Sequence, residues 1–151
     1  MEPELIRVTK KFTFETAHSL LNHDGPCKNI HGHSYKLSVT IIGTPLHQNN
    51  HPKNGMIIDF GDLKKLVNEA VVNDYDHALI LSENHPADLI HEMKKQQQKL
   101  IVVPYQPSCE FLILDIKNRL KNKIIDYPFN LHSLKLEETS TSFTEWHASD
   151  N

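Results

Sequence analysis

Three histidines near the N-terminus are spaced so that they could bind one metal ion. His31 and His33 are two residues apart, so both side chains leave the same face of an extended strand. His18 ends a preceding alternating stretch; alone it would more simply be a packed core residue, but it could complete a three-histidine site. Zinc commonly binds nitrogen ligands, and three protein ligands leave a fourth position open for water or substrate. Together the histidines predict an open, catalytic type of zinc site.

Cys27 supplies a thiol four residues before His31. A nearby metal cation favours the thiolate, which can act as a base or nucleophile. The same thiol could instead be the fourth ligand of a closed structural site, or it could be inert. The residues alone leave these three roles open.

Four more residues could take part in proton transfer or binding. Asp76 directly precedes His77, and a carboxylate beside an imidazole can orient it and raise its basicity. Glu110 starts a predicted helix, where a carboxylate more simply interacts with the helix N-terminus. Glu138 shares the inward parity of a late predicted strand. Each signal is weak alone, since adjacent Asp-His pairs are also common on surfaces.

Composition favours an ordinary globular domain. The chain has 151 residues, of which 38% are apolar and 23% charged, and its net charge is −3 without a long run of one sign. This pattern lowers the expectation of a nucleic-acid or membrane partner. No signal peptide or long apolar run is present, so we expect a cytoplasmic protein with Cys27 and Cys109 as reduced thiols. We expect one domain over residues 1–151, with its core from about 6 to 146.

Alternating residues predict the strands that would position the histidines. Residues 6–17 alternate apolar and polar side chains on the parity of His18, and residues 34–43 alternate on the parity of His31 and His33. We therefore expect a long antiparallel pair whose histidines meet near one end. Four other histidines lie in polar stretches and are expected at the surface: His47, His51, His85 and His91.

Over the whole chain the predicted order is two strands, two helices, two strands, with one small extra strand before the second helix. Apolar spacing predicts a helix over about 60–73, opened by Asp59 or Gly61-Asp62, and one of about 12 residues after the N-cap Ser108. Residues 82–98 are polar, and residues 93–98 are expected to be solvated. Strands are predicted over 100–103, 131–139 and 143–146.

Six motifs follow one another along the chain: Phe14–His18, Cys27–Tyr35, Gly55–Lys64, Asp76-His77, Pro107–Glu110 and Glu138-Thr139. In order and spacing they resemble the 6-pyruvoyl-tetrahydropterin synthase family over nearly the whole chain. Within that family the chain is most similar to the bacterial 6-carboxy-5,6,7,8-tetrahydropterin synthase branch, which feeds queuosine synthesis. The Cys-x-x-x-His-Gly-His element is the most specific of the motifs. Cys109 and Phe111 depart from the residues usual in the family.

The resemblance implies the α+β tunnelling fold, or T-fold, with the order β-β-α-α-β-β. In that fold a four-stranded antiparallel sheet carries two helices on one face. The resemblance also implies a homohexamer, a dimer of trimers, with substrate sites between subunits. Its activity would be that of a zinc-dependent lyase, which converts 7,8-dihydroneopterin triphosphate to 6-carboxytetrahydropterin and releases acetaldehyde and triphosphate.

The resemblance assigns roles to the matching positions of this chain. A neighbouring subunit would supply the Asp76-His77 pair to each site, and Glu138 would accept hydrogen bonds from the pterin. The implied residues are the Zn²⁺ ligands His18, His31 and His33, the proton-transfer groups Cys27, Asp76 and His77, and the substrate-binding residues Glu110, Glu138 and Thr139.

Three alternatives remain open. A 6-pyruvoyl-tetrahydropterin synthase would eliminate triphosphate but leave the substrate side chain intact. A pterin-binding module without catalysis would keep its properties when Cys27 is replaced. A structural zinc protein would unfold when its metal is removed, because binding energy is then folding energy.

Overall fold

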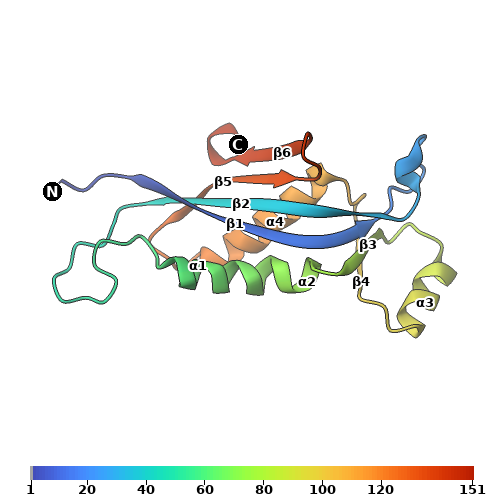
Figure 1. Ribbon diagram of the computed structural model, residues 1–151, viewed down its shortest axis with the longest axis horizontal. Coiled ribbons are helices and arrows are strands. Elements are labelled where there is room, and N and C mark those ends of the chain that lie inside the picture. The colour runs from blue at the N-terminus through green and yellow to red at the C-terminus, as the bar shows by residue number, and fades with distance from the viewer. Residues whose placement is uncertain (1) are drawn as a thin grey trace.

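The computed structural model describes residues 2–151, and its framework is a six-stranded sheet with the strand order β4-β3-β1-β2-β5-β6 (Figure 1). The β1-β2, β2-β5 and β5-β6 pairs are antiparallel, whereas β1-β3 and β3-β4 are parallel. The expected α+β class is confirmed, but the expected four-stranded sheet is wrong, because two short parallel strands extend it beyond β1. The strands are β1 (Ile6–His18), β2 (His31–Gly43), β3 (Ala78–Ser82), β4 (Leu100–Val103), β5 (Asn130–Glu137) and β6 (Phe143–His147).

Three helical segments accompany the sheet, where two were expected. The first is continuous and consists of α1 (Phe60–Val67), the π-helical turn η2 (Asn68–Val72) and α2 (Asn73–Tyr75). The others are α3 (Ala87–Lys95) and α4 (Cys109–Ile124), and the short 3-10 turns are η1 (Pro26–Lys28) and η3 (Ala148–Asp150). The first segment and α4 pack on one face of the sheet, whereas α3 lies at its β3-β4 end (Figure 1).

Side-chain caps start the two packed helices where the sequence predicts. Asp59 Oδ1 accepts the Gly61 N–H at 2.7 Å, and Ser108 Oγ accepts the Phe111 N–H at 3.4 Å. α4 has 16 residues, more than the 12 expected, because Leu120 and Ile124 continue its buried stripe.

The segment between β3 and β4 differs most from expectation. No helix was predicted in the polar residues 82–98, but they contain α3, whose residues are exposed or half-buried. His85 was expected at the surface and is buried instead, with Nδ1 3.1 Å from the Ser82 carbonyl and Nε2 3.3 Å from Ser19 Oγ. The polar composition of this segment hides both features, because α3 has no buried face that would produce a strong apolar period.

The core lies between the sheet and the packed helices. Phe12 and Phe14 of β1 and Tyr35 and Leu37 of β2 point into it, while alternate residues line a polar opposite face. The predicted inward parity of the first two strands is therefore confirmed. Within residues 2–151, no helix has the length and apolar character needed to cross a membrane.

Candidate active site

The pairing of β1 with β2 brings the three predicted histidines together. His18 lies opposite His31 in the register, and His33 lies opposite Thr16. One nitrogen of each ring falls within a group whose atoms are all within 4.8 Å of one another. Among the described residues this is the single cluster of side chains with the geometry to hold a metal, and Cys27 is not a member of it.

Two backbone carbonyls fix the orientation of these rings. His18 Nδ1–H donates to the Pro107 carbonyl at 2.7 Å, and His31 Nδ1–H donates to the Asn29 carbonyl at 2.7 Å. Since a carbonyl can only accept, both protons sit on Nδ1 and both Nε2 atoms keep their lone pairs. Such carbonyl support is the usual outer shell of a metal-bound histidine.

The Nε2 atoms of His18 and His31 lie 3.1 Å apart. Neither lone pair has a proton to share, so the two nitrogens repel each other unless a cation or an added proton lies between them. Tetrahedral zinc with bonds of about 2.0–2.1 Å holds its ligand nitrogens about 3.3 Å apart, so this spacing fits zinc. Burial lowers the pKa of His18, partly opposed by its bond to Pro107, and thereby favours the neutral ring that a metal needs.

The third histidine lies beside the predicted substrate anchor. His33 Nε2 is 3.1 Å from Glu138 Oε1, yet it is buried and makes no well-aligned hydrogen bond. Its lone pair or proton is therefore available to a further partner. Glu138 and Thr139 line a pocket of about 350 Å³ together with Gly32 and His33. This volume is in the range of small-molecule sites.

Cys109, at the start of α4, is a buried thiol. Its S–H contacts the Leu136 carbonyl at 3.6 Å and Thr144 Oγ1 at 3.4 Å. Burial raises the pKa of Cys109 to about 11, so the group is a neutral thiol near pH 7. Both cysteines are free, as expected from the sequence.

Cys27 is half-buried in η1, on a loop whose two ends are joined by hydrogen bonds. The Leu20 N–H donates to the Cys27 carbonyl at 2.9 Å, and Ser19 Oγ donates to the Lys28 carbonyl at 2.8 Å. These bonds hold the thiol-bearing turn against the strand ends that carry His18 and His31. The thiol is accessible without belonging to the metal-binding group.

The Asp76-His77 pair forms a compact unit after α2. Asp76 Oδ2 lies 3.0 Å from His77 Nδ1, and Asp76 Oδ1 accepts the Glu15 N–H at 2.9 Å. The donated Glu15 N–H is the main reason that the pKa of Asp76 is lowered, with burial opposing it. The carboxylate is therefore ionised and placed to orient the imidazole.

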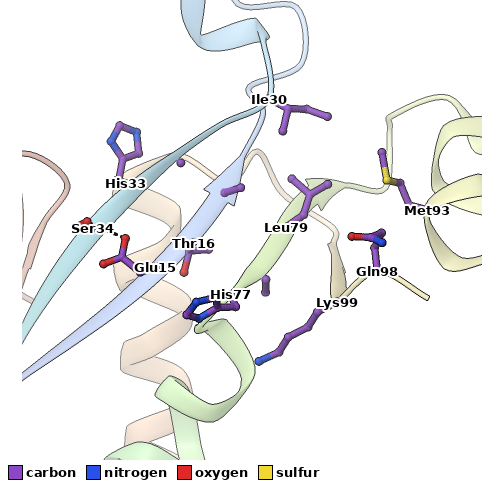
Figure 2. Close-up of a pocket in the computed structure, with 13 residues that line it drawn as sticks. Glu15, Thr16, Ile30, His33, Ser34, His77, Leu79, Met93, Gln98 and Lys99 are labelled. Carbon is purple, nitrogen blue, oxygen red and sulfur yellow. Dashed lines mark hydrogen bonds between the residues drawn. The ribbon is translucent and has the colours of Figure 1, made fainter. Parts of the chain in front are cut away.

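Within one chain, this pair shares a pocket with only one member of the histidine cluster. His77 lines a pocket of about 520 Å³ with Glu15, Ser34 and His33 (Figure 2). His18 and His31 do not line this pocket, and His18 is 1% exposed. A single chain thus places His77 near His33 but not beside the other two histidines.

Glu110 is exposed in the first turn of α4 and lines neither pocket. Sequence reasoning missed the Pro107 and Asn29 carbonyls, because a backbone acceptor carries no residue-type signal. The position of Pro107 just before the Ser108 cap was the one available hint that this loop approaches the site.

Comparison with known proteins gives a consistent result over the whole chain. Residues 7–149 match the family described as 6-pyruvoyl tetrahydropterin synthase. The chain is 37% identical over 144 residues to the 6-carboxy-5,6,7,8-tetrahydropterin synthase of Haemophilus influenzae, and the match covers 94% of this chain and 99% of that protein. The protein of the same name from Rickettsia typhi is 33% identical over 147 residues, covering 93% and 99% of the two chains.

Solved structures show the same fold at lower identity. The 6-pyruvoyl tetrahydropterin synthase of Caenorhabditis elegans matches with a TM-score of 0.69 and 20% identity, covering 98% of this chain and 99% of that one. An uncharacterized protein from Wolinella succinogenes, WS1659, matches with a TM-score of 0.71 and 17% identity, covering 96% and 99%. These matches support the tunnelling fold expected from the sequence.

Proposed function

Because this chain belongs to the 6-pyruvoyl tetrahydropterin synthase family, we propose that it is a zinc-dependent 6-carboxy-5,6,7,8-tetrahydropterin synthase. It would convert 7,8-dihydroneopterin triphosphate to 6-carboxytetrahydropterin with release of acetaldehyde and triphosphate. The observation that carries the proposal is the open three-histidine group beside the pocket that contains Glu138. Relatives of nearly full coverage bear the name of this activity.

The Nε2 atoms of His18, His31 and His33 would hold the zinc, which supplies Lewis-acid polarisation of a substrate oxygen. The carbonyls of Pro107 and Asn29 keep two of these rings in the required tautomer. The site remains open because the fourth position has no protein ligand among the described residues.

The acidic residues beside the metal group would recognise the pterin. Glu138 can accept two hydrogen bonds, which matches the amino and ring N–H groups on one edge of a 2-amino-4-oxo pyrimidine. Thr139 lies next to it in the same pocket. Glu110, at the start of α4, would be an accessory acid.

Proton transfer is assigned to Cys27, Asp76 and His77. Cys27 would move protons at the side-chain carbons of the substrate, and His77 would exchange protons with the substrate while Asp76 holds its ring. Since His18 and His31 do not line the pocket that contains His77, we propose that each site takes its pair from a neighbouring subunit. A hexamer built from two trimers would provide such shared sites.

We further propose that the protein acts as one domain in the cytoplasm and that its product enters 7-deazaguanine and queuosine synthesis. The main alternative is a 6-pyruvoyl-tetrahydropterin synthase, the activity named for the family and for the solved structure from Caenorhabditis elegans. The two activities differ in carbon–carbon cleavage, so the products distinguish them.

The test is to incubate zinc-loaded protein with 7,8-dihydroneopterin triphosphate and to quantify acetaldehyde and pterins. Our proposal predicts one acetaldehyde for each 6-carboxytetrahydropterin formed. A pyruvoyl product without acetaldehyde would assign the alternative activity, and an unchanged substrate that still binds would favour a pterin-binding module.

A further inference from the structure

The turn that carries the Asp76-His77 pair has a strained backbone. His77 has a φ of 61°, in the left-handed region that residues with a side chain rarely adopt. Such a conformation persists only where the surroundings fix it, and it occurs often at functional sites. The contacts that fix this turn therefore control where the imidazole lies.

Strand β1 fixes one side of the turn. The His77 N–H donates to the Glu15 carbonyl at 2.6 Å, and Thr16 Oγ donates to the Tyr75 carbonyl at 2.9 Å. The Tyr75 hydroxyl in turn donates to Asp115 of α4, so the end of α2 is also anchored in the core. The preceding carbonyls at the helix end still need donors, because the last turn of a helix leaves them without partners.

Lys99 supplies these donors from the opposite side. Its ammonium donates to the carbonyls of Asn73 and Asp76, each at 2.7 Å. Its own carbonyl accepts the Leu79 N–H at 2.9 Å. The ammonium binds carbonyls that precede His77, and the Lys99 carbonyl binds the Leu79 N–H that follows it. One residue therefore holds both ends of the strained turn. Figure 2 shows the Lys99 side chain extending toward the turn of His77.

The segment between β3 and β4 delivers this lysine. It runs from Ser82 through α3 to the turn at Gln97, where φ is 55°, and it returns to the sheet at Lys99. The Lys99 ammonium makes no ion pair within 4.0 Å among residues 2–151, so both of its hydrogen bonds are with the turn. The β3-α3-β4 segment therefore places Lys99 beside the turn of His77.

We propose that Lys99 is a positioning residue that holds Asp76 and His77 in their reactive arrangement. The role rests on the proposed function, because it matters for turnover only if His77 transfers protons to or from the substrate. Lys99 acts through the backbone of the turn and does not need to contact the substrate.

The test compares Lys99→Met, which removes the donors but keeps the aliphatic stem, with Lys99→Arg, which can donate to both carbonyls. Lys95→Met is the matched control, because Lys95 is exposed on α3 and contacts only Glu92 at 3.9 Å. The steady-state kinetics of zinc-loaded proteins are measured beside the amide hydrogen exchange of His77.

Lys99→Met should lower kcat by about 10- to 100-fold, as expected for a displaced catalytic group, with KM changed by less than about twofold. Exchange at the His77 amide should become at least about tenfold faster. Lys99→Arg should restore most of both properties, and Lys95→Met should resemble the wild type. Should Lys99→Met fail to fold, Lys99→Gln, which keeps one donor group, takes its place.

Unchanged kcat and unchanged exchange in Lys99→Met would overturn the proposal. So would a loss that appears mainly in KM, or one that Lys99→Arg does not relieve. If wild-type protein shows no turnover, the proposed function fails, while the exchange comparison still reports whether Lys99 holds the turn.

Discussion

At the scale of single residues, the orientation of two imidazoles is the strongest chemical constraint in the protein. The carbonyls of Pro107 and Asn29 take the Nδ1 protons, which leaves two Nε2 lone pairs facing each other at 3.1 Å. This arrangement is unfavourable without a cation and natural with one. The spacing of the three histidines predicted the ligands. The tautomers of His18 and His31 depend on backbone carbonyls, whose positions cannot be read from residue types.

Asp76→Asn should make the stability of the folded chain less dependent on acid pH. The Glu15 N–H lowers the pKa of Asp76 in the fold. A carboxylate of this kind stabilises the fold above its unfolded pKa of about 4, and the contribution is lost as the pH falls through the lower folded pKa. Urea unfolding should find the wild type more stable at pH 7 and the two proteins equal once Asp76 is protonated in the fold.

Asp126→Asn is the matched control, since Asp126 is exposed and its carboxylate makes no hydrogen bond or ion pair among residues 2–151. It should show no such convergence with pH. A difference between wild type and Asp76→Asn that stays constant from pH 7 to strong acid would contradict the assigned cause of the pKa shift.

At the scale of elements, the packed helices and the long strands follow from their apolar periods. Leu112 of α4 is 1% exposed in the core, whereas Leu114 of the same helix is 39% exposed. Leu112→Ala should therefore reduce the free energy of unfolding by about 2–5 kcal/mol, because it leaves a cavity. Leu114→Ala should cost less than about 1 kcal/mol.

Chemical denaturation of the two variants measures this difference directly. Equal losses for the two leucines would mean that α4 does not present the Leu112 side of the helix to the core. The comparison is sharp because the same side-chain change is made two residues apart on one helix.

The elements that sequence reasoning missed are those without an apolar period of their own. β3 is a run of five residues, Ala78–Ser82, buried between parallel neighbours, so its side chains do not alternate. α3 has no buried residue, so its sequence lacks the apolar period that would predict a helix. By contrast, β1 and β2 have one buried and one polar face. Their alternation predicted that the two strands pair and that His18 and His31 lie close together.

At the scale of the whole molecule, the proposed function divides the site between subunits. Within one chain His77 shares a pocket with His33, but His18 and His31 do not line that pocket. Under the proposed function, a complete site takes the Asp76-His77 pair from a second copy of the chain. The sequence alone could not reveal which ligands lie near His77, because that depends on the contact between Glu15 and Asp76.

Shared sites predict that two inactive variants restore each other. Cys27→Ala and His77→Ala chains, unfolded together and reassembled in equal amounts, should regain about one quarter of the wild-type activity by random mixing. Each variant reassembled alone should stay inactive. An inactive mixture that contains both chains in one oligomer would show that Cys27 and His77 act from the same subunit.

In the proposed site, metal binding and proton transfer belong to different residues, and the most direct test of this separation is the zinc content and turnover of Cys27→Ala. We expect about one zinc per chain, as in the wild type, with turnover lowered by about 10²- to 10⁴-fold. His31→Ala should lose the zinc itself, while Lys28→Ala, a change at the exposed neighbour of Cys27, should keep both properties. Loss of zinc from Cys27→Ala would instead make the thiol a fourth ligand, and full turnover in this variant would remove it from the mechanism.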